Sequence, residues 1–188
     1  MLIEDGSIKD ILTGELPPEF KSDDVLTERA AYIMPGLVEA HCHLFLDGGE
    51  LDFKKRSEYL KADENEMLAV ARRNVEASLA TGITLIRDAG DKWGINHRIR
   101  EETAASDELV PEVRSPGLGI RKPKRYGGFM AREVETKDEI LAAIKDLLKT
   151  GDELKILLTG IIDFETGTVK GKPQFDVDEA KLIVATAH

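Results

Sequence analysis

The sequence predicts a parallel α/β fold of about four strand–helix units, preceded by a short β segment. Two observations lead to this prediction. From Leu37 onward, short apolar or β-branched runs alternate with longer stretches of helical periodicity, which is the pattern of parallel strands joined by crossover helices. The first run also begins after the turn signal Pro35-Gly36 and ends on two histidines, His41 and His43. We therefore expect a chemically active strand end at the start of the alternation.

Composition limits the classes of function. The 188 residues carry a formal charge of −10 and are 41% hydrophobic, which is enough for a buried core, and no run approaches the ~20 apolar residues of a membrane span. An acidic balance argues against nucleic-acid binding, because such binding depends on Lys and Arg at phosphates. A single cysteine excludes an internal disulfide framework, and residues 1–5 lack the features of a signal peptide. We expect a cytoplasmic protein with no nucleic-acid or membrane partner.

Residues 1–33 are predicted to form a small β segment of their own. The runs 2–5 and 8–12 flank Gly6-Ser7, which is a plausible hairpin turn. A polar break at 17–24 follows. We place the domain boundary before residue 34, so that residues 34–188 form the α/β domain.

The elements of that domain follow in order along the chain. Each predicted strand is an apolar or β-branched run, at residues 37–43, 83–87, 112–115 and 154–159. Capping signals followed by helical periodicity predict helices at 64–80, within 96–106, at 136–148 and from 176 onward. A long loop rich in Gly, Pro and basic residues is expected from Pro116 to about Met130. Because a helical pattern is still running at His188, we expect the chain to be part of a longer protein.

The strand at 37–43 presents a candidate metal-binding pair. Alternate side chains of a strand share a face, so His41 and His43 point the same way and Cys42 points toward a packed helix. Neutral imidazole nitrogen suits zinc and similar ions, whereas the alternative is two surface histidines. Lys155 lies inside an otherwise apolar strand. A buried ammonium is costly unless it is paired or chemically changed, although the lysine could instead extend to solvent.

Three motifs together resemble those of the amidohydrolase superfamily, which comprises metal-dependent hydrolases built on a (β/α)8 barrel. The decapeptide MPGLVEAHCH at 34–43 resembles the family's first-strand signature. The segments ITLIRDAG at 83–90 and LKILLTG at 154–160 are similar to the second- and fourth-strand motifs of the subgroup related to imidazolonepropionase and Xaa-Pro dipeptidases. A complete barrel takes about 250 residues. The resemblance therefore implies a partial TIM barrel, its N-terminal half, after a β-sandwich segment.

The resemblance also implies a reaction. The expected function is hydrolysis of a C–N bond in a small amide, cyclic amide or dipeptide by a metal-activated water. His41 and His43 would hold one divalent ion, with zinc the first candidate, and a carbamylated Lys155 would bridge it to a second. The family's remaining ligands and its proton-shuttling aspartate come later, so we assign no catalytic residue and expect the polypeptide alone to be inactive and to self-associate, including as a homo-oligomer. The alternative is an inactive half-barrel that at most binds metal.

Other polar residues are given structural roles. Asp88, at the end of the second strand, is expected to fix a loop, and Glu39 to support the histidines. His97 is expected at the surface and His188 in a helix. The basic run 121–125 is expected to be a solvated loop, or otherwise a patch that attracts an anionic substrate.

Overall fold

The computed structural model describes residues 1–21, 24–160, 166–169 and 171–188. These residues divide into two compact units, Met1–Pro35 and Gly36–His188. The expected boundary lies two residues before this division. That the first unit forms part of a β-sandwich stays a prediction.

The first unit contains a β-hairpin and a short 3-10 helix. Strand β1 (Leu2–Glu4) pairs antiparallel with β2 (Ser7–Asp10). Between them, Asp5 and Gly6 both have positive φ, 50° and 70°, as in the two-residue type I′ turns that match the twist of a hairpin. The turn therefore lies one residue earlier than the expected Gly6-Ser7. The 3-10 helix η1 (Pro18–Phe20) lies in the predicted polar break.

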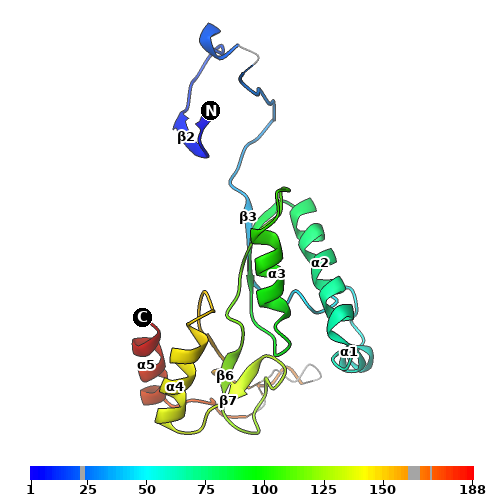
Figure 1. The fold of residues 1–188 in the computed structure, drawn as a ribbon, viewed down its shortest axis with the longest axis vertical. Helices are drawn as coiled ribbons and strands as arrows, with labels where there is room; N and C mark the ends of the chain where they lie inside the picture. Colours follow the sequence, from blue (N-terminus) through cyan, green and yellow to red (C-terminus); the bar gives the residue numbers. More distant parts are fainter. Residues whose placement is uncertain (22–23, 161–165, 170) are drawn as a thin grey trace. The chain divides into compact units, whose positions relative to one another are not determined.

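The second unit contains two short parallel sheets that follow one another along the chain (Figure 1). The first sheet has the order β3-β4-β5 and consists of β3 (Leu37–Cys42), β4 (Ile83–Asp88) and β5 (Glu112–Arg114). The second has the order β7-β6-β8 and consists of β6 (Gly119–Arg121), β7 (Ala131–Glu133) and β8 (Lys155–Ile156). Only residues 115–118 separate β5 from β6, so the third predicted strand continues into β6. The four predicted strands therefore keep their chain order from neighbour to neighbour.

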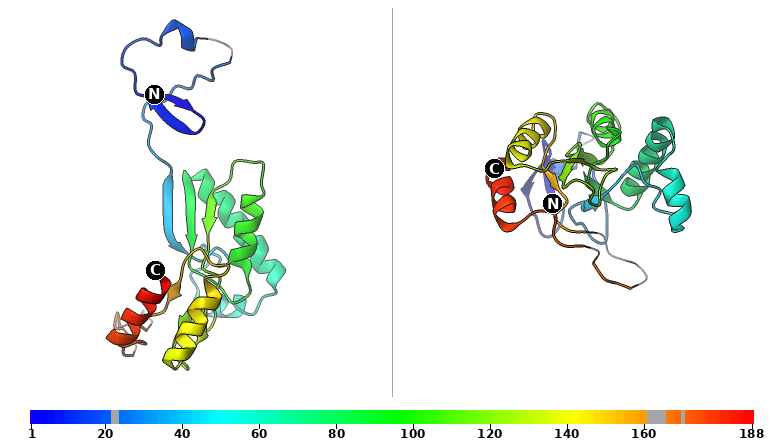
Figure 2. Two further views of the ribbon diagram at one scale, coloured as in Figure 1. Left: turned by 60° about the vertical axis from the view of Figure 1, so that its left-hand side comes forward. Right: turned by 90° about the horizontal axis from the view of Figure 1, so that it is seen from below.

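Helices cover the outer side of these strands. The helices are α1 (Phe53–Tyr59), α2 (Glu64–Ala80), α3 (Ile95–Ala104), α4 (Lys137–Leu147) and α5 (Val177–Ala187). In Figure 2 (right), α2, α3, α4 and α5 follow one another in an arc along one side of the strands. A doubly wound sheet would have helices on both faces, so this arrangement is that of a partial (β/α) barrel. The predicted fold class is confirmed.

Four elements differ from the expectation. Helix α1 was not predicted, because its sequence FKKRSEY is polar and its start depends on the Asp52 carboxylate, which accepts from the N–H groups of Lys54 and Lys55. Strands β6 and β7 lie inside the expected loop and are only three residues long. Strand β8 has two residues instead of six, since the carbonyl of Leu158 accepts from the N–H of Gln174 rather than continuing the ladder.

The two larger apolar clusters among the described residues form most of the core of the second unit. One joins β3 and β4 to α2 and α3, and includes Phe45, Met67, Ile86 and Ile99. The other joins β6 to α4 and α5, and includes Ile120, Ile140, Ile144, Phe175 and Ile183. No helix in the described part of the chain has the length and apolarity that crossing a membrane requires.

The predicted helix starts at α4 and α5 are confirmed by reciprocal capping boxes, Thr136 with Glu139 and Asp176 with Glu179. We expect Thr136→Ala to lower the free energy of unfolding by about 1 kcal/mol, because the N–H of Glu139 loses its acceptor. Urea denaturation measures the change. Thr186→Ala in the exposed face of α5 is the matched control, since its hydroxyl donates to the Leu182 carbonyl within the helix. Equal losses in both variants would contradict the capping role.

Candidate metal centre

His41 and His43 lie together at the C-terminal end of β3, where barrel enzymes carry their site residues. Their ring centroids are 6.1 Å apart. The Nδ1 atom of His43 is 2.9 Å from the carbonyl oxygen of Gly90. A carbonyl can only accept, so this nitrogen carries the proton and Nε2 keeps a free lone pair. Metal-binding histidines are oriented in this way by a partner on the other ring nitrogen.

The acceptor for His43 is held in place by Asp88. Its fully buried carboxylate accepts from the N–H of Leu44 at 2.8 Å and from the N–H of Gly90 at 2.7 Å. Burial raises the pKa of Asp88 to about 7. A Cβ on Gly90 would lie 2.8 Å from the carbonyl oxygen of Gly117, so the turn needs glycine. Asp88 therefore joins the loops after β3 and β4, in agreement with the structural role expected for it.

Lys155 comes from β8 and reaches the same place. Its Nζ atom lies 3.2 Å from Nε2 of His41. Burial, followed by the nearby charge of Arg87, lowers the pKa of Lys155. The charge of Lys155 lowers the pKa of His41, and burial lowers the pKa of His43 to about 4. Both shifts favour the neutral imidazole, which is the form that binds metal ions.

The position of Lys155 depends on a glycine in the neighbouring strand. Gly119 pairs with Lys155 in the sheet. A Cβ there would lie 2.8 Å from Cγ of Lys155 and 2.9 Å from its carbonyl oxygen. The lysine stem therefore crosses over Gly119 on its way to His41. A cavity of about 280 Å³ adjoins His41, His43 and Lys155, and its other lining side chains include Tyr126, Met130 and Leu157.

The donor set fits a metal only in part. Within the described residues, no group of three or more His, Cys, Asp or Glu side chains is placed to hold an ion. Two imidazoles and a lysine do lie together: Nε2 of His43 keeps its lone pair, and Nε2 of His41 contacts the Nζ atom of Lys155. Glu39 bonds to the backbone beside them, because its Oε1 accepts from the N–H of His41 at 2.9 Å. Among the residues that the structure describes, the set reaches three only if Lys155 becomes an anion.

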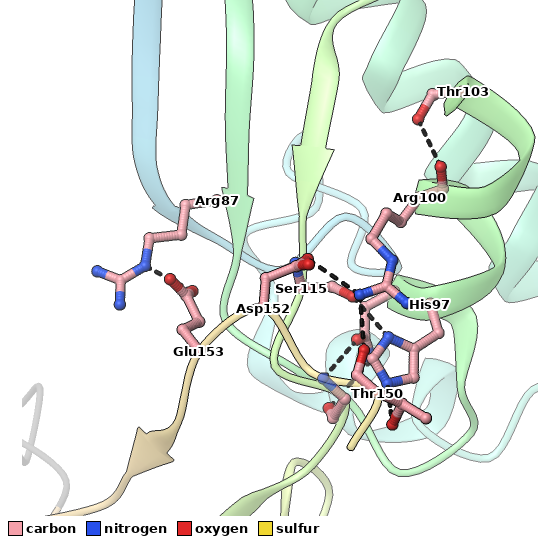
Figure 3. Close-up of polar contacts among 10 residues, drawn as sticks. Arg87, His97, Arg100, Thr103, Ser115, Thr150, Asp152 and Glu153 are labelled. Atoms are coloured by element: carbon pink, nitrogen blue, oxygen red, sulfur yellow. Dashed lines mark hydrogen bonds and ion pairs between the residues drawn. The ribbon is translucent and has the colours of Figure 1, made fainter. Parts of the chain in front are cut away.

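The prediction for His97 was wrong. This residue is half-buried and bonds with its Nδ1 to the Ser115 hydroxyl at 2.7 Å, and its Nε2 lies 3.4 Å from the Thr150 hydroxyl (Figure 3). Its partners are far away along the chain, so the polar sequence around it gave no sign of them. His188 ends α5, as predicted. Cys42 packs against the apolar core, also as predicted, and burial raises its pKa to about 12.

The basic run 121–125 is largely engaged in internal contacts. Arg121 pairs with Glu133 at 2.8 Å, and Lys122 pairs with Glu179 at 2.5 Å while also donating to the Glu135 carbonyl. Arg125 donates to the carbonyl of Lys172. These contacts tie β6 to β7 and to the start of α5. The arrangement favours a structural role for this run over attraction of an anionic substrate.

Comparison by sequence finds relatives of this chain. No family model matches the chain. Curated relatives from Mycobacterium tuberculosis and Mycobacterium bovis, described as uncharacterized proteins, are 29% identical over 160 residues, which is 84% of this chain and 36% of theirs. The chain thus spans little more than a third of the length of these relatives.

Solved structures of hydrolases share the fold. A prolidase complexed with N-methylphosphonate-L-proline has a TM-score of 0.61 at 20% identity, over 82% of this chain and 40% of its own. A Xaa-Pro dipeptidase with bound methionine has a TM-score of 0.60 at 20% identity, over 81% and 40%. An amidohydrolase has a TM-score of 0.60 at 20% identity, over 88% and 45%.

These likenesses define the fold class as part of the barrel that prolidases and amidohydrolases share. The resemblance to the amidohydrolase superfamily that the three motifs indicated is confirmed in the fold. The structure brings His41 and His43 together with Lys155, while their role as metal ligands stays a prediction.

Proposed function

We propose that this chain carries part of the active site of a metal-dependent hydrolase that cleaves a C–N bond in a small amide, cyclic amide or dipeptide. The proposal rests on the contact between Lys155 Nζ and His41 Nε2, which lie 3.2 Å apart although 114 positions separate the two residues in the chain. The names of the similar structures, prolidase, dipeptidase and amidohydrolase, support this class of reaction. Zinc is the proposed ion, as one or two atoms.

Each residue has a defined task in this proposal. His43 offers Nε2 while Gly90 fixes its ring, and His41 offers Nε2 on the same side. The lowered pKa of Lys155 favours the neutral amine, which is the form that reacts with carbon dioxide. The amine nitrogen would form a bond to the carbon of carbon dioxide and release one proton to solvent. The resulting carbamate would place an anion beside the two imidazoles instead of a half-buried ammonium, whose burial is costly. A bound divalent ion would supply an activated water and polarise the carbonyl group.

Zinc binding tests the proposal directly. We expect the wild-type protein to bind zinc in competition with a chromophoric chelator. His41→Ala and His43→Ala should weaken binding by more than the roughly 10- to 100-fold that loss of a supporting residue costs. With ¹³C-bicarbonate, a carbamate signal should appear in the NMR spectrum and be absent from Lys155→Gln. His188→Ala is the matched control, because this exposed histidine lies at the end of α5. Equal zinc affinity in the wild type, His41→Ala, His43→Ala and His188→Ala would refute the site.

An inactive metal-binding half-barrel is the second candidate, and the incomplete donor set among the described residues favours it. Zinc-loaded protein supplied with bicarbonate and assayed against dipeptides and cyclic amides separates the two. Turnover that disappears in His41→Ala would exclude the inactive form.

A further inference from the structure

Lys155 lies on a strand that is too short to fix its own position. Strand β8 has only two residues and pairs with β6 on one side. The placement of the lysine must therefore depend on what holds the chain before and after it. Two backbone bonds bracket the lysine: Asp152 N–H donates to the Ser115 carbonyl at 2.9 Å, and Leu157 N–H donates to the Ile120 carbonyl at 3.1 Å. Both bonds join positions with the same separation along the chain, so the register does not change between them.

The first of these two anchors is reinforced by side chains. The Asp152 carboxylate accepts from the N–H of Ser115 at 2.8 Å and from the Arg100 guanidinium at 3.0 Å (Figure 3). Arg100 also donates to the carbonyl of Thr150 at 2.8 Å. The side chains of Arg100 and Asp152 are 22% and 30% exposed, so this pair is less screened than a typical surface pair. We call Arg100, Ser115 and Asp152 the β8 clamp.

The β8 clamp is itself attached to α3 by His97. The ring bonds to the Ser115 hydroxyl and lies close to the Thr150 hydroxyl, so it touches both chains that the clamp joins. A Cβ on Gly117 would lie 2.6 Å from Nε2 of His97, so the imidazole fills the space beside that glycine. The third strand and the start of β8 are thus both held from the same helix.

The opposite side of the segment is tied to the sheet that carries His41. Glu153 accepts from the Arg87 guanidinium at 2.5 Å, and Arg87 belongs to β4, which pairs with β3. Between this pair and the β8 clamp, the chain entering β8 is fixed in two directions. A slip of one residue would turn Lys155 to the other face of the sheet, away from His41.

We propose that the β8 clamp, supported by His97, is a positioning device that sets Lys155 against His41. None of its members lies within hydrogen-bonding distance of His41 or His43 among the contacts of the described residues, so it acts through the register of β8. The purpose of this placement rests on the proposed function, but the placement itself does not require a metal.

The placement is tested in metal-free protein by NMR. The ring protons of His41 should show a nuclear Overhauser effect to the ε-methylene of Lys155 in the wild type. We expect this signal to disappear in Asp152→Ala and to remain in Asp152→Asn, which keeps an oxygen for the Ser115 N–H. The matched control is Asp146→Ala, which removes from α4 a carboxylate that pairs with Arg132 and Lys149. It should leave the signal intact.

A purely structural role would lower stability without moving Lys155 in the folded protein. Retention of the full signal in folded Asp152→Ala would therefore overturn the proposal, as would its loss in Asp146→Ala. If Asp152→Ala does not fold, Arg100→Gln decides, because it removes only one partner of the clamp and should weaken the signal; an unchanged signal there refutes the proposal.

Zinc affinity separates this inference from the proposed function. If wild-type protein binds zinc, Asp152→Ala should bind it about 10- to 100-fold more weakly. If wild-type protein binds no zinc, the proposed function fails, while the NMR signal still decides whether the clamp positions Lys155. An unchanged zinc affinity together with a lost signal would show that the clamp places the lysine but that the lysine does not serve the metal, which overturns the link between the two.

Discussion

Replacing Asp88 with alanine is expected to lower the free energy of unfolding by about 2 to 6 kcal/mol. The carboxylate is fully buried and accepts from two backbone N–H groups, those of Leu44 and Gly90. Each buried donor left without an acceptor costs about 1 to 3 kcal/mol. Urea denaturation followed by circular dichroism measures the change. Because Gly90 also accepts from His43, the variant should lose the fixed orientation of that imidazole as well.

Asp47→Ala provides a matched control for this result. The carboxylate of Asp47 also accepts from a backbone N–H, that of Gly49 at 2.9 Å, but it is exposed to solvent. Water can replace it there, so a change within about 0.5 kcal/mol is expected. Similar losses in the two variants would show that burial of the Asp88 bonds has no special importance.

The same carboxyl group predicts a pH dependence of stability. Burial raises the pKa of Asp88 from its ordinary 3.8 to about 7 in the folded protein. The folded state therefore binds the proton more tightly than the unfolded state, so this group contributes stability that is fully present below about pH 4 and is lost as the pH rises through about 7. The thermal unfolding midpoint of the wild type should therefore fall relative to that of Asp88→Asn as the pH rises from 4 to 8. A constant difference across this range would contradict the raised pKa.

Elements with long periodic patterns and clear caps could be predicted from the sequence. Helix α2 has the predicted bounds, and α4 and α5 begin at the predicted capping residues. Strands β3 and β4 also lie where expected, because an apolar or β-branched run after a turn residue specifies each of them locally. By contrast, β6 and β7 form by pairing with each other, β6 also pairs with β8, and three residues are too few to show a period.

The candidate site shows the same division. The face shared by His41 and His43 follows from strand alternation alone, and the apolar surroundings of Lys155 marked it as unusual. The features that place these side chains come from other segments: the Gly90 carbonyl, the room above Gly119 and the Asp152 carboxylate. Each depends on contacts between positions distant in the chain, so no local pattern could reveal them. Metal binding itself stays a prediction.

Replacing Gly119 with alanine is expected to displace Lys155 and to destabilise the protein by about 1 to 3 kcal/mol, the usual cost of overpacking. The new Cβ would lie 2.8 Å from Cγ of Lys155 and 2.9 Å from its carbonyl oxygen. The side chain can move, but the carbonyl belongs to β8, so the strand itself must shift away from β6. The signal between His41 and Lys155 should weaken, and any zinc affinity should fall with it.

Two further variants make this expectation specific. Gly48→Ala is the matched control, because a Cβ there has no heavy atom within 4 Å. It should leave both stability and the signal unchanged. The double variant Gly119→Ala with Lys155→Ala removes the Cγ contact and keeps the contacts with the carbonyl oxygen and with Cβ of residue 155, the latter at 3.1 Å. It should therefore recover part of the lost stability relative to the sum of the single variants. Full additivity of the two losses would show that the lysine stem does not depend on the space above Gly119, and the close approach of β6 to β8 would then have to be explained by the backbone alone.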